Sequence, residues 1–355
     1  MNNTHLQEQF LTLLNELLQI ASPSGREENM AGFIRRSLDE MGYEHETDSA
    51  GNVLVRLDGQ DSNAPLCVYA AHMDEIGVVV TQINEDGTLR LEASGRLSPF
   101  KIGEGPLHFV GDKGDITAIL SFGTGHTSSL EGGIAWKDVR AITGFSKTQL
   151  EELGIRPGST GVPVAEGRGP LLIGDPSDPF VSAWTLDDRA GMTVQLQLLR
   201  LIKEQNLQPH HPTIIAFTVH EEGGCHGAKV LAHREQPGIF ISVDGFPWVP
   251  DAGVEVNDRP ACASMDLLAH YDQRLIKKMT EATQLAGTRL QPMVLQNAYC
   301  DASAVYNSGG APRAGFIGHV RYNSHGFEVA KLSVFPNVAN TLAELLKMEI
   351  PESQS

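Results

Sequence analysis

Histidine and acidic residues form short clusters that directly follow apolar runs of the sequence. In one of them, His72 and Asp74 come after the apolar run at residues 66–71. A histidine in such a His-x-Asp arrangement can bind a metal ion while a carboxylate holds its second ring nitrogen in the matching tautomer. The cluster therefore indicates a metal ligand. Its simpler alternative is a histidine hydrogen-bonded to a loop at a strand end.

Two adjacent acids, Glu221 and Glu222, stand between the apolar run at residues 213–219 and two glycines. Neighbouring side chains that leave a strand point in different directions. One carboxylate can therefore bind a metal while the other faces the substrate as a general base. Two buried acids without a cation would cost on the order of several kcal/mol, whereas acids in a solvated loop would escape that cost.

Single acids and a histidine complete the candidate set. Asp187 precedes a helical pattern and Asp244 ends the apolar run at residues 239–243. Helix capping and turn formation are their simpler explanations. His325 is the C-terminal candidate, and His319 lies close by in the sequence. Together these imidazoles and carboxylates suit zinc, cobalt or manganese, and two such ions about 3.5–4 Å apart would share a water and polarise a carbonyl.

The elements that must position these residues are predicted to form an α/β domain. The continuously apolar run at residues 66–71 is typical of a strand buried on both faces, as in a mostly parallel sheet. After Asp187, strand patterns alternate with helical ones, which indicates a mostly parallel sheet sandwiched by helices. Ligand sites of such sheets lie where the strands end, and each acidic or histidine cluster falls at such a place.

Residues 77–180 have a different texture. Short alternating runs are separated there by glycine, proline and aspartate, which predicts a small inserted all-β domain resembling a barrel. We therefore expect a catalytic domain at residues 1–76 and 181–355 with the insert between its two parts.

The overall composition narrows the classes of partner. A formal net charge of −17 disfavours nucleic acid and anionic membrane surfaces, because both repel an acidic protein. No apolar run reaches the roughly 18 residues of a membrane span. Leucines at residues 6–18 recur at helical spacing, which predicts an amphipathic helix rather than a signal peptide. The four cysteines are too widely spaced for a zinc knot or disulfide framework, so we expect a cytoplasmic protein.

Three motifs carry a resemblance to a known family. They are Ala-His-Met-Asp-Glu-Ile-Gly at residues 71–77, Asp-Asp-Arg-Ala-Gly at 187–191 and Glu-Glu-Gly-Gly-Cys-His-Gly-Ala at 221–228. In this order they resemble the dinuclear metallo-aminopeptidases typified by glutamyl aminopeptidase and the tetrahedral (TET) aminopeptidases. The likeness extends from residue 22 to the last predicted helix.

The resemblance implies a role for each candidate. It also implies two divalent ions per subunit, zinc foremost with cobalt or manganese as alternatives, and an insert that makes contacts in a homo-oligomer such as a dodecamer. By this resemblance, His72 and Asp244 would bind one metal, Glu222 and a C-terminal histidine would bind the other, and Asp187 would bridge both. Glu221 would act as the general base, and Asp74 would orient His72.

Two departures from the family pattern suggest a divergent subgroup. The family's C-terminal histidine position holds Ser324 here, and His325 follows one residue later. A shift by one residue would turn the side chain away on a regular strand, but a loop or bulge would restore it. We therefore favour His325 over His319. Residues 123–127 also differ, and the chain is similar to a branch associated with N-acetylglutaminylglutamine amide osmoprotectant systems.

Three functions are compatible with these residues. The first is an aminopeptidase that hydrolyses peptides or small amides. The second is a two-metal amidohydrolase that deacylates a small acylated amino acid or dipeptide, using the same ligands. The third is a catalytically weak scaffold relative, which the displacement of His325 from the family's histidine position suggests. The adjacent Glu221 and Glu222 argue against a scaffold, because a scaffold needs no buried base.

Overall fold

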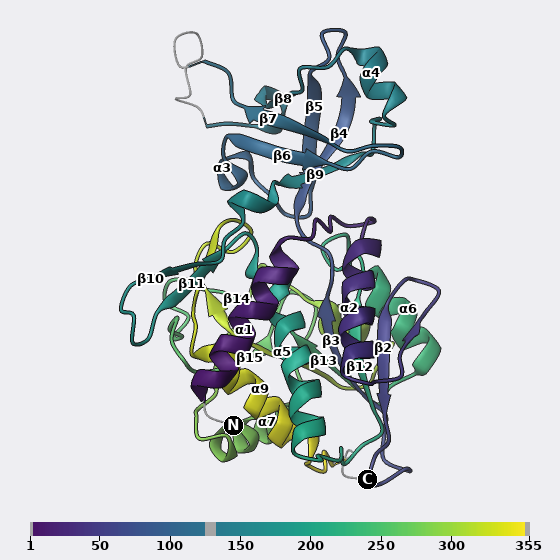
Figure 1. Cartoon of the computed structure of the whole chain (residues 1–355). Coiled ribbons are helices and arrows are strands. Elements are labelled where there is room, and N and C mark those ends of the chain that lie inside the picture. The colour runs from purple at the N-terminus through teal and green to yellow at the C-terminus, as the bar shows by residue number, and fades with distance from the viewer. Residues whose placement is uncertain (1–2, 125–132, 352–355) are drawn as a thin grey trace.

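The computed structural model describes residues 3–124 and 133–351. Residues 125–127, part of the segment that differs from the family pattern, lie outside the described residues. Its larger unit is built on an eight-stranded sheet, and a closed barrel lies above it in Figure 1. In spatial order the strands of the sheet are β1 Glu46–Thr47, β2 Val53–Leu57, β12 Thr213–Thr218, β3 Cys67–His72, β13 Ile239–Val243, β17 Ala314–Gly318, β15 Ala261–Met265 and β16 Gln291–Val294.

The four central strands, β12, β3, β13 and β17, run parallel to one another. Each is buried along its whole length, in keeping with the continuously apolar runs of their sequences. Strands β2 and β15 flank them in antiparallel orientation, so the complete sheet is mixed. Because parallel strands end at the same edge, the residues that follow β12, β3 and β13 meet there.

Helices α1 Asn3–Leu18 and α5 Leu186–Glu204 pack on each other and on α9 Val334–Leu346, which also packs on α7 Gln273–Leu285. Helix α5 packs on β3 and β13 as well. Helix α1 lies with its leucine-rich face buried, which confirms the predicted amphipathic helix. None of the helices in the described residues is both long and apolar enough to cross a bilayer. The other helices of this unit in the described residues are α2 Glu28–Glu40, α6 His226–Glu235 and α8 Asp301–Asn307.

The barrel has its own apolar core, separate from that of the sheet. Strands β5 Leu89–Ser94 and β7 Ile116–Ser121 alternate buried with more exposed residues, because one face of each strand points into the barrel. Two short helices, α3 Pro99–Ile102 and α4 Lys147–Glu152, accompany it. In closed order the strands are β4 Gly77–Ile83, β5 Leu89–Ser94, β8 Arg140–Ile142, β7 Ile116–Ser121, β6 Gly105–Phe109 and β9 Thr160–Pro163.

Two small sheets join the segment after the barrel and the segment after β13 to the C-terminal part of the chain. Strands β10 Leu171–Ile173, β11 Phe180–Ala183 and β19 Glu328–Lys331 form one of them, so the barrel itself ends at β9 although β10 still lies within residues 77–180. Strands β14 Phe246–Pro247 and β18 Val320–Arg321 form the other. These pairings bring the segments after β11, β13 and β18 together at the sheet edge.

Candidate active site

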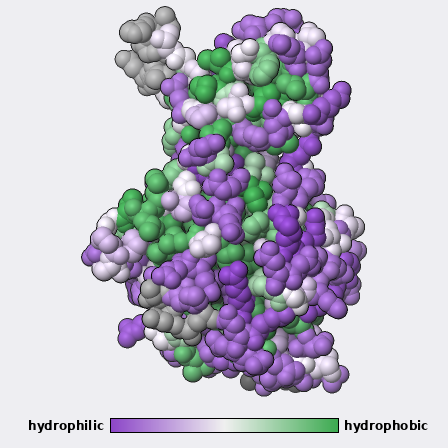
Figure 2. Space-filling view, in the orientation of Figure 1, coloured by the Kyte–Doolittle hydropathy of each residue, from purple (hydrophilic) through white to green (hydrophobic). Residues whose placement is uncertain are grey.

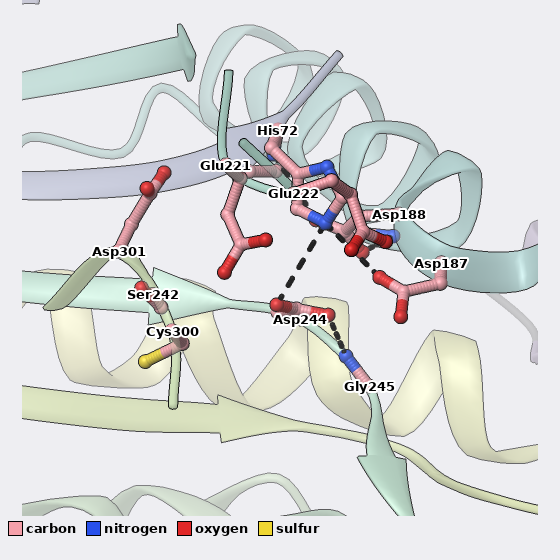
Figure 3. A network of polar contacts seen from close by, with 12 residues as sticks. His72, Asp187, Asp188, Glu221, Glu222, Ser242, Asp244, Gly245, Cys300 and Asp301 are labelled. Atoms are coloured by element: carbon pink, nitrogen blue, oxygen red, sulfur yellow. Dashed lines mark hydrogen bonds and ion pairs between the residues drawn. The ribbon is translucent and has the colours of Figure 1, made fainter. Parts of the chain in front are cut away.

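The clusters that were separate in the sequence converge at the end of the parallel strands. His72 ends β3, Glu221 and Glu222 follow β12, and Asp244 follows β13. Asp187 lies at the start of α5. Figure 3 shows their side chains pointing toward one another. The structure therefore brings together the residues that the sequence placed at separate strand ends.

His72 lies at the centre of this group. Its Nε2 atom is 3.0 Å from Asp187 Oδ1 and 3.9 Å from Asp244 Oδ2. Its Nδ1–H donates to the backbone carbonyl of Asp74 at 3.0 Å, and the Asp74 carboxylate is 3.5 Å from the same nitrogen. A carbonyl can only accept, so the proton stays on Nδ1 and Nε2 faces the acids as a metal ligand would.

Asp74 also fixes the loop that carries the two glutamates. Its carboxylate oxygens accept the backbone N–H groups of Glu221 at 2.9 Å and Glu222 at 3.1 Å, and the Ser24 hydroxyl at 2.6 Å. Asp74 is completely buried. One side chain therefore positions both the histidine of β3 and the glutamate pair of β12, which is more than the sequence predicts for it.

The group holds more buried negative charge than its own cations neutralise. Burial, with the nearby charge of Asp187, raises the pKa of Glu222 to about 7, and the same two causes raise the pKa of Asp244 to about 7. The Oε1 atom of Glu222 is buried and has no hydrogen-bond partner among the described residues. These donors fit divalent cations, since a cation would stabilise the ionised carboxylates.

Candidate metal-ligand atoms gather in two overlapping groups, each of which includes His72. His72, Asp187 and Glu222 form one group and His72, Asp188 and Asp244 the other, each with its ligand atoms within 4.8 Å. The sequence did not single out Asp188 as a ligand. Its carboxylate accepts the backbone N–H of His72 at 3.2 Å, and a Cβ at Gly191 would meet that carboxylate at 2.3 Å, so this position of α5 needs glycine.

The displaced histidine reaches the site. His325 lies in the loop between β18 and β19 with φ +60°, so the regular strand that would turn it away is absent at this position. Its Nε2 is 3.7 Å from both Asp187 Oδ2 and Glu222 Oε1, and its Nδ1–H donates to the carbonyl of Arg96 at 3.0 Å. His319 instead is buried against Phe335, with ring centroids 4.9 Å apart.

Two residues of the site have roles that the sequence did not reveal. The Arg321 guanidinium contacts the Asp187 carboxylate and donates from Nε to Glu328 at 2.8 Å. The Glu328 carboxylate in turn accepts the backbone N–H groups of Asp187 at 2.9 Å and of His325 at 3.0 Å. Pairing of β11 with β19 creates these contacts, and no local sequence signal announces them.

A third unforeseen residue lies behind the glutamate pair. Asp301, at the start of α8, is buried and accepts the Thr218 hydroxyl at 2.6 Å. Its carboxylate lies near Glu221 and the Cys225 thiol, whose Sγ is 3.6 Å from Glu221 Oε1. Figure 3 shows Asp301 on the side of Glu221 that is away from Asp187 and Asp188.

The acids open into a cavity of about 870 Å³. Asp187, Glu221, Glu222 and Asp244 line one part of it. Proline and aliphatic residues from β14 and β16 line another, together with Tyr299. A cavity of this size, with convergent polar groups beside apolar walls, suits a small peptide or amide.

The M42 glutamyl aminopeptidase family matches this chain over residues 51–340. The glutamyl aminopeptidase of Lactococcus lactis subsp. cremoris (strain MG1363) is 31% identical over 240 residues, and the lysyl aminopeptidase of Pyrococcus furiosus (strain ATCC 43587 / DSM 3638 / JCM 8422 / Vc1) is 26% identical over 238. Each alignment spans 65% of this chain and 65% of the relative. The solved Pyrococcus horikoshii TET1 peptidase, which can assemble into a tetrahedron or a large octahedral shell, matches with a TM-score of 0.83 at 25% identity, over 95% of this chain and 99% of the other. The chain therefore belongs to the M42 glutamyl aminopeptidase family, a family of peptide hydrolases.

Proposed function

We propose that the chain is a metal-dependent aminopeptidase that hydrolyses N-terminal residues from peptides. The observation that carries this proposal is the convergence of His72, His325 and several buried acids beside Glu221, where the acids line one cavity. A structural ion pair would need fewer acids, and a solvated loop would not bury them. The family to which the chain belongs supports the same activity.

The ligand assignment is part of the proposal. We assign His72 and Asp244 to one ion, Glu222 and His325 to the other, and Asp187 to both. Two divalent ions, zinc foremost with cobalt or manganese as alternatives, would when bound polarise the scissile carbonyl and lower the pKa of the attacking water. The Nε2 atoms of both histidines face the acids, which suits this assignment.

Glu221 is the proposed general base. It is buried at the cavity wall beside Glu222, and its backbone is fixed by Asp74. We propose that it takes the proton of the attacking water and returns it to the leaving amine. Asp74 keeps His72 and the glutamate loop in place, and Arg321 offsets part of the charge of Asp187.

The test combines metal content with hydrolysis of aminoacyl anilides and dipeptides by wild type and Glu221→Gln. We expect two metals per chain in both proteins and a loss of kcat of at least about 100-fold in the variant. Hydrolysis of acylated amino acids but of no aminoacyl substrate would instead establish the deacylase alternative. Absence of metal and of any amide hydrolysis in the wild type would leave the scaffold alternative.

We also propose a homo-oligomer whose contacts involve the insert and strand β10. Leu171, Leu172 and Ile173 of β10 are 54%, 53% and 46% exposed on the edge of a small sheet, and a green apolar area covers this hairpin in Figure 2. An exposed apolar edge strand favours association. Light scattering on Leu172→Lys should show smaller particles, whereas Leu285→Lys, at an exposed position of helix α7, should not. Equal masses for wild type and Leu172→Lys would exclude β10 from the contact.

A cytoplasmic location completes the proposal. All four cysteines are buried free thiols. Disulfides are common in oxidising compartments and rare in the cytosol, so this set of thiols suits a reducing compartment.

A further inference from the structure

The cavity contains a positive side chain that comes from the barrel rather than from the catalytic unit. Arg96 follows β5 and lines the same cavity as the acids of the metal groups. Its backbone carbonyl accepts the Nδ1–H of His325 at 3.0 Å. The backbone of Arg96 is therefore hydrogen-bonded directly to a residue of the candidate metal site.

The guanidinium of Arg96 is held in place without a carboxylate partner. It donates to the backbone carbonyl of Asn297 and lies 5.6 Å from the ring centroid of Tyr299. These are its contacts among the described residues, and neither neighbour carries a negative charge. The neighbouring aromatic ring and one carbonyl hold the guanidinium, while its other N–H groups stay available on an exposed side chain.

The rest of the cavity has the opposite electrostatic character. Arg321 is the other arginine among the described residues that line the cavity, and its guanidinium already forms ion pairs with Asp187 and Glu328. The remaining charged lining residues are mainly acids. Among the described lining residues, Arg96 is therefore the arginine whose guanidinium contacts no carboxylate, and a substrate carboxylate away from the proposed metal positions would be stabilised beside it.

We infer that Arg96 binds a carboxylate of the substrate, so that the enzyme prefers short peptides with a free carboxylate near the scissile bond. This inference rests on the proposed aminopeptidase function. A planar guanidinium matches a carboxylate with two parallel hydrogen bonds. The carboxylate can be the free C-terminus of a dipeptide or an acidic side chain of the N-terminal residue. Relatives described as glutamyl and lysyl aminopeptidases show that family membership does not decide the preference.

The experiment uses two matched pairs of substrates that differ in one carboxylate. Ala-Ala and Ala-Ala amide test the C-terminal carboxylate, and Glu-anilide and Gln-anilide test the side chain. The measured quantity is the ratio of kcat/KM within each pair, for wild type, Arg96→Gln, Arg96→Lys and the control Arg90→Gln. Arg90 is exposed on β5 and is not among the described residues that line the cavity.

The wild type should prefer the carboxylate member of one pair, which identifies the source of the carboxylate. Arg96→Gln should reduce that ratio about 10- to 100-fold, as expected for the loss of charge-assisted hydrogen bonds. Arg96→Lys, which keeps the charge, should reduce it less, and Arg90→Gln should retain the wild-type ratio. If Arg96→Gln is poorly folded, Arg96→Lys still has to change the ratio.

Unchanged ratios in both Arg96 variants would overturn the inference, as would a wild type without preference in either pair. Both results would leave the peptidase proposal intact, because the neutral substrates are still cleaved. A wild type that cleaves none of the four substrates contradicts the proposed function itself, and the two failures are therefore distinguishable.

Discussion

The carboxylate of Glu328 accepts the backbone N–H of Asp187 at 2.9 Å, although 141 residues separate them. The same carboxylate accepts the backbone N–H of His325 at 3.0 Å. Glu328 thus connects the acid proposed to contact both metals with the loop that carries the displaced histidine. The β11–β19 pairing, with Ala183 opposite Glu328, produces this arrangement.

Glu328→Gln should therefore weaken metal binding without removing a ligand. The amide has one acceptor oxygen, so either Asp187 or His325 loses its partner. Loss of such supporting contacts commonly costs about 10- to 100-fold in metal affinity. Competition with a chelating dye would measure the affinity. Glu85→Gln is the control, because Glu85 is exposed and its ion pair among the described residues is with Lys147, away from the site. Equal metal affinities in the two variants would contradict the role of Glu328.

The two C-terminal histidines should behave differently when replaced. His325→Ala should lower the metal content from about two ions per chain to about one, because Nε2 of His325 faces Asp187 and Glu222. His319→Ala should retain both ions and lose stability instead, since burial holds His319 neutral, with a pKa lowered to about 3, against Phe335. Elemental analysis checks both, and metal loss confined to His319→Ala would reverse the assignment.

The sequence predicted the part of the site that depends on local patterns. The apolar runs of β3, β12 and β13 are continuous, so His72, the glutamate pair and Asp244 could be placed at strand ends before the fold was known. The amphipathic α1 and membership of the aminopeptidase family are likewise confirmed. The ligand roles stay predictions until metal binding is measured.

The remaining parts depend on contacts between distant segments. Glu328, Arg321 and Asp301 acquire their roles only when β11 pairs with β19, β14 with β18, and α8 packs beside β13. No spacing of residue types in a single segment encodes such pairings. Arg96 is a further example, because it lies in the insert yet lines the cavity of the other unit.

The metal-free protein should lose stability as pH rises from about 4 to about 7. Glu222 and Asp244 have ordinary pKa values of 4.5 and 3.8, and burial beside Asp187 raises both to about 7 in the folded chain. Within this window the unfolded chain releases the protons that the folded chain retains, which favours unfolding. Below the window both states are protonated, so these groups no longer affect the equilibrium.

Urea denaturation of chelator-treated protein across pH 4 to 7.5 would measure this dependence. The double variant Glu222→Gln/Asp244→Asn cannot ionise at these positions and should show a flatter pH profile than the wild type. Added zinc should restore wild-type stability near pH 7 by stabilising the ionised carboxylates. Identical profiles for the wild type and the double variant would contradict the raised pKa values.

Glu75 should be essential for stability although it lies outside the proposed metal ligands. Its Oε1 atom accepts hydrogen bonds from Arg168 at 3.0 Å, Arg189 at 2.9 Å and the backbone of Ser22 at 2.9 Å. All three side chains of this ion cluster are almost completely buried. Glu75→Gln removes the charge that compensates two buried guanidinium groups, and we expect a loss of about 3–5 kcal/mol in the free energy of unfolding.

Glu46→Gln is the matched control, because Glu46 also contacts two arginines but is exposed, where such pairs contribute about 0–1 kcal/mol. If the unfolding free energies of the two variants agree within about 1 kcal/mol, the buried cluster tolerates the loss of the Glu75 charge. Other contacts would then hold β3, α5 and the segment after the barrel together.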